Sequence, residues 1–198
     1  GGKGDLTGIT GHPAASALLI YLVKHTEVEI SQENNDIPTK IYGSVYGGGE
    51  VANVGQFHWD QNPANLAISN IQLTGGGHSK VTISGGTIGA DKMRMDYTLV
   101  GGTGADKYDL RYNTDVGHVC GGGKGKVDNP GNWDNVNVIY KGSKTAQDVS
   151  LLNVMATVNT TEVIIKDNAF VKGSVFGGSM NGHVLDSTYV KMEGGQEI

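Results

Sequence analysis

The chain has 198 residues, of which 32 are glycine and only 4 are proline, and its formal net charge is -5. The glycines have no strict three-residue period, which excludes collagen, and recurring clusters of Val, Ile and Leu disfavour disorder. A net negative charge leaves no basic footprint for a polyanion, so nucleic acid is not an expected partner.

Cysteine usage and hydrophobicity say little about the cellular compartment in which the protein is found. Cys120 is the only cysteine, so no intrachain disulfide can form. The longest apolar run, residues 14–23, has about ten residues, which is too short to span a bilayer. We therefore expect no membrane insertion in this segment, and no secretory signal pattern is present.

The first predicted element is residues 13–25, "PAASALLIYLVKH". Its alanine and leucine content, with Pro13 just inside the start, predicts a short helix that caps the N-terminal end of the fold. A buried strand is the alternative, because "LLIYLV" is also β-prone.

Four short segments with strict apolar–polar alternation follow along the chain. They are "TEVEIS" (26–31), "KVTISGG" (80–86), "TEVIIKD" (161–167) and "TYVKMEGG" (188–195). Their aligned apolar pairs are Val28/Ile30, Val81/Ile83, Val163/Ile165 and Val190/Met192. A period of two predicts strands with one buried face and one solvated face.

A glycine motif alternates with these strands. It reads "GSVYGGG" at 43–49, "GHVCGGG" at 117–123 and "GSVFGGS" at 173–179. Two motifs that return in fixed order predict an all-β parallel β-helix, or β-solenoid, in which residues 1–198 form one segment. The glycines would serve as sharp corners or as places where neighbouring backbones approach closely. An antiparallel sandwich with glycine-rich hairpins is the alternative.

The spacing of the strands is uneven. The interval from Val163 to Val190 is the shortest, while those from Val28 to Val81 and from Val81 to Val163 are roughly twice and three times as long. The longer intervals predict about two and three coils, filled by long loops or degenerate coils. We expect insertions at 55–70 and 91–115, and a chain cut from a longer repeat array.

Two Trp-Asp segments are the candidate ligand-binding loops. Trp59 lies within 55–70, and Trp133 lies in the aromatic segment 129–140. Aromatic rings with nearby amides are suited to stacking on sugars, and loops on a rigid scaffold often bind ligands. Simple packing of the rings over the coil edge is the alternative.

The sequence gives one weak calcium candidate and no other cofactor. "GGTGADKYD" at 101–109 fits a calcium-binding nonapeptide, with Asp106 and Asp109 as the carboxylate ligands. Ile88 breaks the neighbouring copy that would complete such a site, so we predict that no metal and no cofactor is bound.

Catalytic chemistry has two further candidates, both weak. Acidic and basic residues alternate through 91–115, as they also do in a solvated insertion. Cys120 and His118 occupy repeat positions held elsewhere by an aromatic residue and a serine, which favours packing over a nucleophile pair.

The ordered copies of "VTISGGTIG", "GSVYGGG" and "GSVFGGSMNGHVLDSTYVKMEGG" resemble the glycine-rich repeats of large surface proteins of gut Bacteroidales-type bacteria. This resemblance implies a parallel β-helix and an adhesin-like protein that is at the cell surface or secreted. We therefore predict a non-enzymatic structural or adhesive segment, with host or microbial glycans or surface proteins as partners. A carbohydrate-active β-helix enzyme (lyase or hydrolase) and a glycan-binding module are the alternatives.

Overall fold

Parallel β-structure dominates the part of the chain that the structure describes. The computed structural model describes residues 23–33, 36–50, 52–58, 71–89, 117–125 and 155–194, and the backbone of four strands within 95–99, 108–112, 133–134 and 139–140. All regular elements in this part of the chain are strands, and none is a helix. The all-β class predicted from the sequence is therefore confirmed.

The largest sheet, sheet A, has four parallel strands. They are β1 (His25–Ser31), β6 (His78–Ser84), β13 (Thr157–Lys166) and β16 (His183–Glu193). Their spatial order, β1-β6-β13-β16, is also their order along the chain. Each strand is thus laid directly on the preceding strand of the same sheet.

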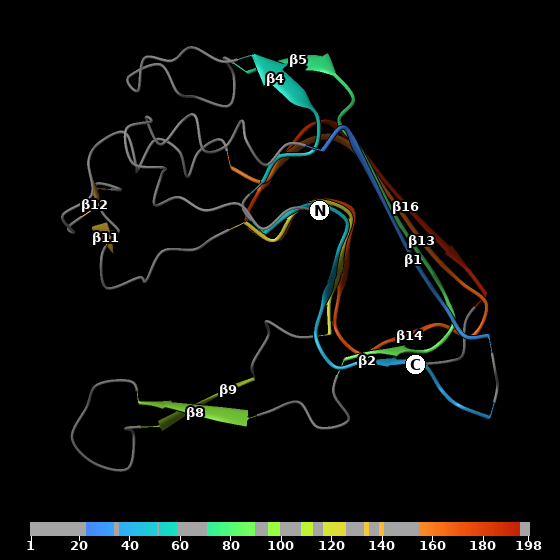
Figure 1. Cartoon of the computed structure of the whole chain (residues 1–198). Helices are drawn as coiled ribbons and strands as arrows, with labels where there is room; N and C mark the ends of the chain where they lie inside the picture. Colours follow the sequence, from blue (N-terminus) through green and yellow to red (C-terminus); the bar gives the residue numbers. More distant parts are fainter. Residues whose placement is uncertain are drawn as a thin grey trace, which may run out of the picture.

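Two smaller parallel sheets repeat the same order. Sheet B consists of β2 (Lys40–Ile41), β7 (Thr87–Ile88) and β14 (Phe170–Val171), and sheet C of β3 (Val45–Tyr46), β10 (Val119–Cys120) and β15 (Val175–Phe176). The chain visits sheets A, B and C in turn three times and then returns to sheet A at β16. We call these passages coils 1, 2 and 3. Viewed along the stack, the three sheets form the sides of a triangle (Figure 1).

Three antiparallel pairs interrupt this path between parallel strands. They are β4 (Gln56–His58) with β5 (Gln72–Gly75), β8 (Met95–Leu99) with β9 (Tyr108–Tyr112), and β11 (Trp133–Asp134) with β12 (Ile139–Tyr140). Antiparallel hairpins close locally, so they can leave and rejoin a parallel stack without breaking its hydrogen bonds.

The predicted apolar pairs of sheet A are in register. Val28 pairs with Val81, Val81 with Val163, and Val163 with Val190. The second residue of each pair follows two positions later in the same register, from Ile30 to Met192. Alternation along the strand therefore becomes a ladder of like side chains across the sheet.

The core lies inside the triangle and receives side chains from all three sheets. Val81, Ile83, Ile88, Val119 and Val163 have no exposed surface. The three valines of the glycine motif are aligned, because Val119 pairs with Val45 on one side and Val175 on the other. Val45 and Val119 are buried, and Val175 packs against the same core at the last coil.

Close packing explains the repeated glycine after each of these strands. A Cβ on Gly121 would overlap the carbonyl oxygen of Gly177 and would lie 2.9 Å from both Thr161 Cβ and Val163 Cγ2. Gly177 meets Thr188 and Val190 of the next coil in the same way. This glycine does not have a positive φ, so what it provides is space for a neighbouring strand.

Backbone conformation matters at a different corner, where sheet A ends. Gly85, Asp167 and Gly194 occupy equivalent positions after β6, β13 and β16, with φ of 147°, 57° and 77°. The "SGG" part of the strand motif thus supplies the turn, whereas the "GGG" motif supplies close approach.

Two predictions about the path of the chain need correction. The long intervals from Val28 to Val81 and from Val81 to Val163 each contain one coil, not two or three, because β1 pairs directly with β6 and β6 with β13. The helix predicted over 13–25 lies mostly outside the described residues. At its end, Val23 forms a parallel bridge with Val54 and His25 begins β1, so residues 23–25 are not helical.

Candidate functional site

The outer face of sheet A carries the main group of charged side chains in the described part of the chain. Glu27, Lys80 and Glu162 occupy one register position on β1, β6 and β13, and His25 and His78 lie two residues earlier on their strands. Alternation puts these residues on the solvent side because Val28, Val81 and Val163 point inward.

Contacts between acidic and basic side chains connect the neighbouring coils on this face. Lys80 Nζ lies 3.9 Å from Glu27 Oε1, and His78 Nε2 lies 4.0 Å from Glu162 Oε2. His78 Nδ1 and Thr160 Oγ1 are 2.9 Å apart, a hydrogen bond whose donor depends on the ring tautomer. The side chains border an open depression of about 410 Å³.

The spacing of this ladder favours cross-strand stabilisation over catalysis. Glu27 and Glu162 are two rungs apart, about 9.5 Å from the usual strand spacing. An inverting glycosidase separates its two carboxyl groups by about 6.5–9.5 Å, but that space must hold a sugar and a water. Here Lys80 lies on the rung between them. Exposed pairs of this kind contribute about 0–1 kcal/mol each to stability.

This ladder was not predicted from the sequence. The aligned strands were interpreted from their apolar positions, and the residues between these positions only as a solvated face. The same alignment puts Glu27, Lys80 and Glu162 at one position with alternating charge, which was the available signal. Among the described residues, no group of His, Cys, Asp and Glu has the arrangement of a metal site.

His118 has a structural role at the corner between sheets B and C. Its backbone N–H donates to Ser44 Oγ at 3.0 Å, and its own Nδ1 accepts from the backbone N–H of Ser174 at 2.9 Å. The His118 imidazole thus accepts a backbone N–H of coil 3, just as the Ser44 hydroxyl accepts a backbone N–H of coil 2. Its ring also lies against Phe176, with centroids 5.7 Å apart.

Cys120 is a buried packing residue. It pairs with Tyr46 and Phe176 in sheet C, as the repeat alignment predicted, and none of its surface is exposed. Burial raises the pKa of the Cys120 thiol to about 11. Because the thiolate is the nucleophilic form, this environment opposes covalent catalysis.

The other candidate residues lie in parts of the chain where the structure gives no side-chain geometry. Trp59 and Asp106 are outside the described residues, while Trp133 and Asp109 are described by their backbone only. Trp133 of β11 pairs with Tyr140 of β12, and Asp109 of β9 pairs with Thr98 of β8. Their role as site residues therefore stays a prediction.

The whole segment 90–116 is inserted at one point of coil 2. A Cβ on Gly89 would lie 3.1 Å from the Cα of Gly117, so the two ends of the segment meet. In coils 1 and 3 the same corner consists of three residues, 42–44 and 172–174. The charged segment 91–115 therefore leaves and rejoins the stack at a single corner.

Comparison of the chain with protein-family models, curated proteins and solved structures gave no match. Within the described residues, no helix has the length and apolar character needed to cross a membrane.

Proposed function

We propose that the three coils and β16 form a parallel β-solenoid that serves as a structural or adhesive segment of a bacterial cell-surface protein. The observation that carries this proposal is the in-register ladder from Val28 to Val190, which four strands continue without a shift at these positions. A stack of this kind is a stiff spacer, since each coil adds a hydrogen-bonded layer about 4.8 Å thick.

Two features support a structural role over catalysis. The interior is filled by side chains of all three sheets, and on the charged outer face Lys80 forms an ion pair with Glu27 while His78 lies next to Glu162. The location at the cell surface rests on the resemblance of the repeats alone. Glycans or surface proteins are the partners that this role would have.

A glycan array run alongside a reducing-end assay tests the role. We expect no product with any polysaccharide, because Glu27 and Glu162 each lie against a basic side chain of the neighbouring coil and Cys120 is buried. Binding that is lost in Trp59→Ala or Trp133→Ala would indicate the glycan-binding module. Product that disappears in Glu162→Gln, Asp106→Asn or Asp109→Asn would overturn the non-enzymatic role.

A further inference from the structure

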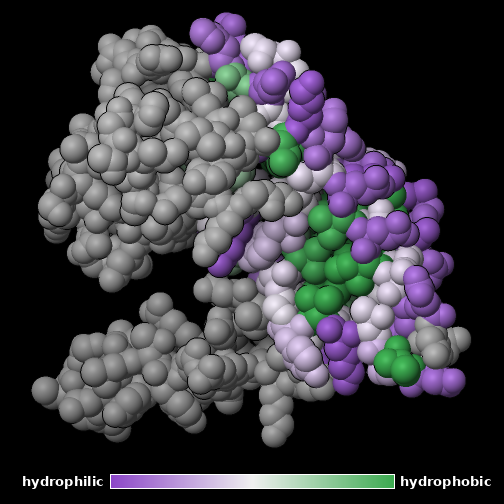
Figure 2. All heavy atoms as spheres, in the orientation of Figure 1, coloured by the Kyte–Doolittle hydropathy of each residue, from purple (hydrophilic) through white to green (hydrophobic). Residues whose placement is uncertain are grey.

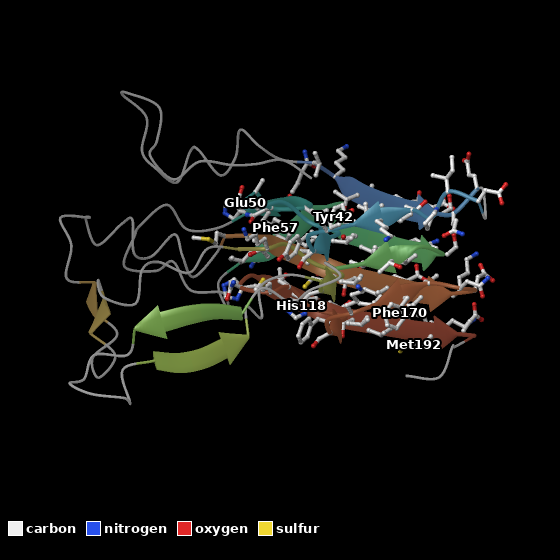
Figure 3. All side chains as sticks on the ribbon, turned by 90° about the horizontal axis from the view of Figure 1, so that it is seen from below. Tyr42, Glu50, Phe57, His118, Phe170 and Met192 are labelled. Atoms are coloured by element: carbon white, nitrogen blue, oxygen red, sulfur yellow. The ribbon has the colours of Figure 1, made fainter. Side chains whose placement is uncertain are left out.

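Within the described residues, the strand at each end of the stack has one edge that pairs with no other strand. Among the described strands, β1 has a neighbour only in β6, and β16 only in β13. An unpaired edge presents a row of free N–H and C=O groups and is a template for pairing with another chain. Figure 3 shows the stack from the side, with Met192 and Phe170 near the end formed by the last coils.

Both ends also expose part of the core. Val190 is 42% exposed and Met192 67% exposed, although their partners Val163 and Ile165 are buried. At the opposite end, Val28 and Ile30 are only partly buried. Figure 2 shows apolar side chains inside the outline of the three sheets at the end that faces the viewer, where β1 lies in front.

We propose that the β16 edge of one copy of this chain pairs with the β1 edge of a second copy, so that copies associate head to tail. The register that continues the ladders puts Thr188 opposite Thr26, Val190 opposite Val28, and Met192 opposite Ile30. Each inward position would then meet a residue of the same kind, as it does at the three junctions within the chain.

Charge complementarity on the outer face selects this partner and this register. The same alignment puts Lys191 opposite Glu29, and both residues are exposed. Lys191 forms an ion pair with Glu193 of its own strand, whereas Glu29 has no ion pair with another described residue. The new contact would therefore add an acidic partner for Lys191 and a basic partner for Glu29.

Sheet A alone makes the proposed contact. In the described part of the chain, sheets B and C end at β14 and β15 of coil 3, and β16 continues one rung beyond them. The contact joins two different surfaces, so it does not close on itself and can extend beyond a dimer. It requires the stacked sheets and an accessible β1 edge, which means that the cap predicted over 13–25 must leave this edge open. It does not depend on the biological role proposed above.

Charge reversal at the two edges tests the proposal. The purified chain is examined by sedimentation velocity and light scattering over a wide range of concentration. We expect species larger than a dimer in the wild type. Lys191→Glu and Glu29→Lys should each weaken association about fivefold or more, because each puts like charges opposite each other.

Mixing the variants gives the sharper result. Each variant alone has like charges at both ends, but an equimolar mixture of Lys191→Glu and Glu29→Lys restores opposite charges at junctions between the two. We expect the mixture to associate more strongly than either variant alone. Glu33→Lys is the matched control, since it makes the same charge change on an exposed residue outside β1 and should have no effect.

Circular dichroism verifies that each variant is folded, so that a loss of association cannot come from unfolding. A wild type that stays monomeric at all concentrations would overturn the proposal. So would growth that stops at a dimer, or association that is unchanged by both reversals. These results leave the structural role untouched, while product in the reducing-end assay would overturn that role without affecting the pairing of edges.

Discussion

At the scale of single residues, the first glycine of the motif lets sheet C pack closely against sheet A of the next coil. The first glycine after each sheet C strand lies against a hydroxyl and a valine of sheet A in the next coil, as Gly121 does against Thr161 and Val163. Ser79 and Thr161 also donate their hydroxyls to the carbonyls of Gly121 and Gly177. The interior therefore has no room for a methyl group at this position.

Substitution of this glycine should destabilise the protein. We expect Gly121→Ala to lower the free energy of unfolding by about 1–3 kcal/mol, because backbone and β-branched atoms cannot move aside. Urea denaturation measures the change. Gly43→Ala is the matched control: a Cβ there has no neighbour within 4 Å, so stability should stay within about 0.5 kcal/mol. Equal losses in the two variants would contradict the packing argument.

The buried thiol makes stability depend on alkaline pH. A solvated cysteine titrates near 9.0, while burial raises the pKa of Cys120 to about 11. Between these values the unfolded chain loses its proton first, so rising pH favours unfolding. The free energy of unfolding should fall by about 2–3 kcal/mol across this window.

Urea denaturation at pH 8 and at pH 11 measures this loss. Cys120→Ala supplies the reference, because its lysines and tyrosines titrate as in the wild type while the thiol is absent. The stability difference between the two proteins should shrink as the pH rises through this window. A difference that does not change with pH would show that the thiol is solvated.

At the scale of elements, alternation in sheet A decides which substitutions a strand tolerates. Val163 has no exposed surface, and its neighbour Ile164 lies on the outer face opposite Lys191. We expect Val163→Asp to prevent folding, because an unpaired buried carboxylate costs several kcal/mol. Ile164→Asp should stay folded, since its charge is solvated and faces a lysine.

Far-UV circular dichroism and chromatography of the soluble fraction distinguish these outcomes. The two substitutions introduce the same side chain at adjacent positions, so overall charge is matched. If Val163→Asp folded as well as Ile164→Asp, the assignment of inner and outer faces would be wrong.

Local patterns determined how much of this fold could be predicted. The alternation around Val28, Val81, Val163 and Val190 is a property of a few adjacent residues, and it gave the strand class, the inward face and the register. The number of coils depends on where the chain leaves the stack. The meeting of Gly89 with Gly117 is a contact across a long insertion, and nothing local in the sequence encodes it.

The candidate site was predictable only in part, for a similar reason. The packing role of Cys120 followed from its repeat position and is confirmed, whereas the hydrogen bond that His118 accepts from Ser174 was not predicted. The ladder of Glu27, Lys80 and Glu162 forms only when three distant strands stack, and its charges look like ordinary surface residues within each strand.

At the scale of the whole molecule, the stack and its insertions are separable. Deleting residues 90–116 would join Gly89 to Gly117 and give coil 2 the three-residue corner of coils 1 and 3. We expect this variant to fold with the same three sheets and to lose less than about 1 kcal/mol of stability. Circular dichroism with urea denaturation measures both. A deletion variant that is unfolded would show that the segment is required for the core.

Unequal coil lengths set an order of folding events. The loop closed by pairing β13 with β16 is roughly a third as long as the loop closed by pairing β6 with β13, so its entropic cost is lower by about 1 kcal/mol. The C-terminal pair should therefore nucleate, with the stack then propagating toward the N-terminus. In stopped-flow experiments, Val190→Ala should slow refolding while Val28→Ala mainly accelerates unfolding. The long loops of the first two coils thus make the later steps slow, and they give folding a direction from the C-terminal pair toward the N-terminus.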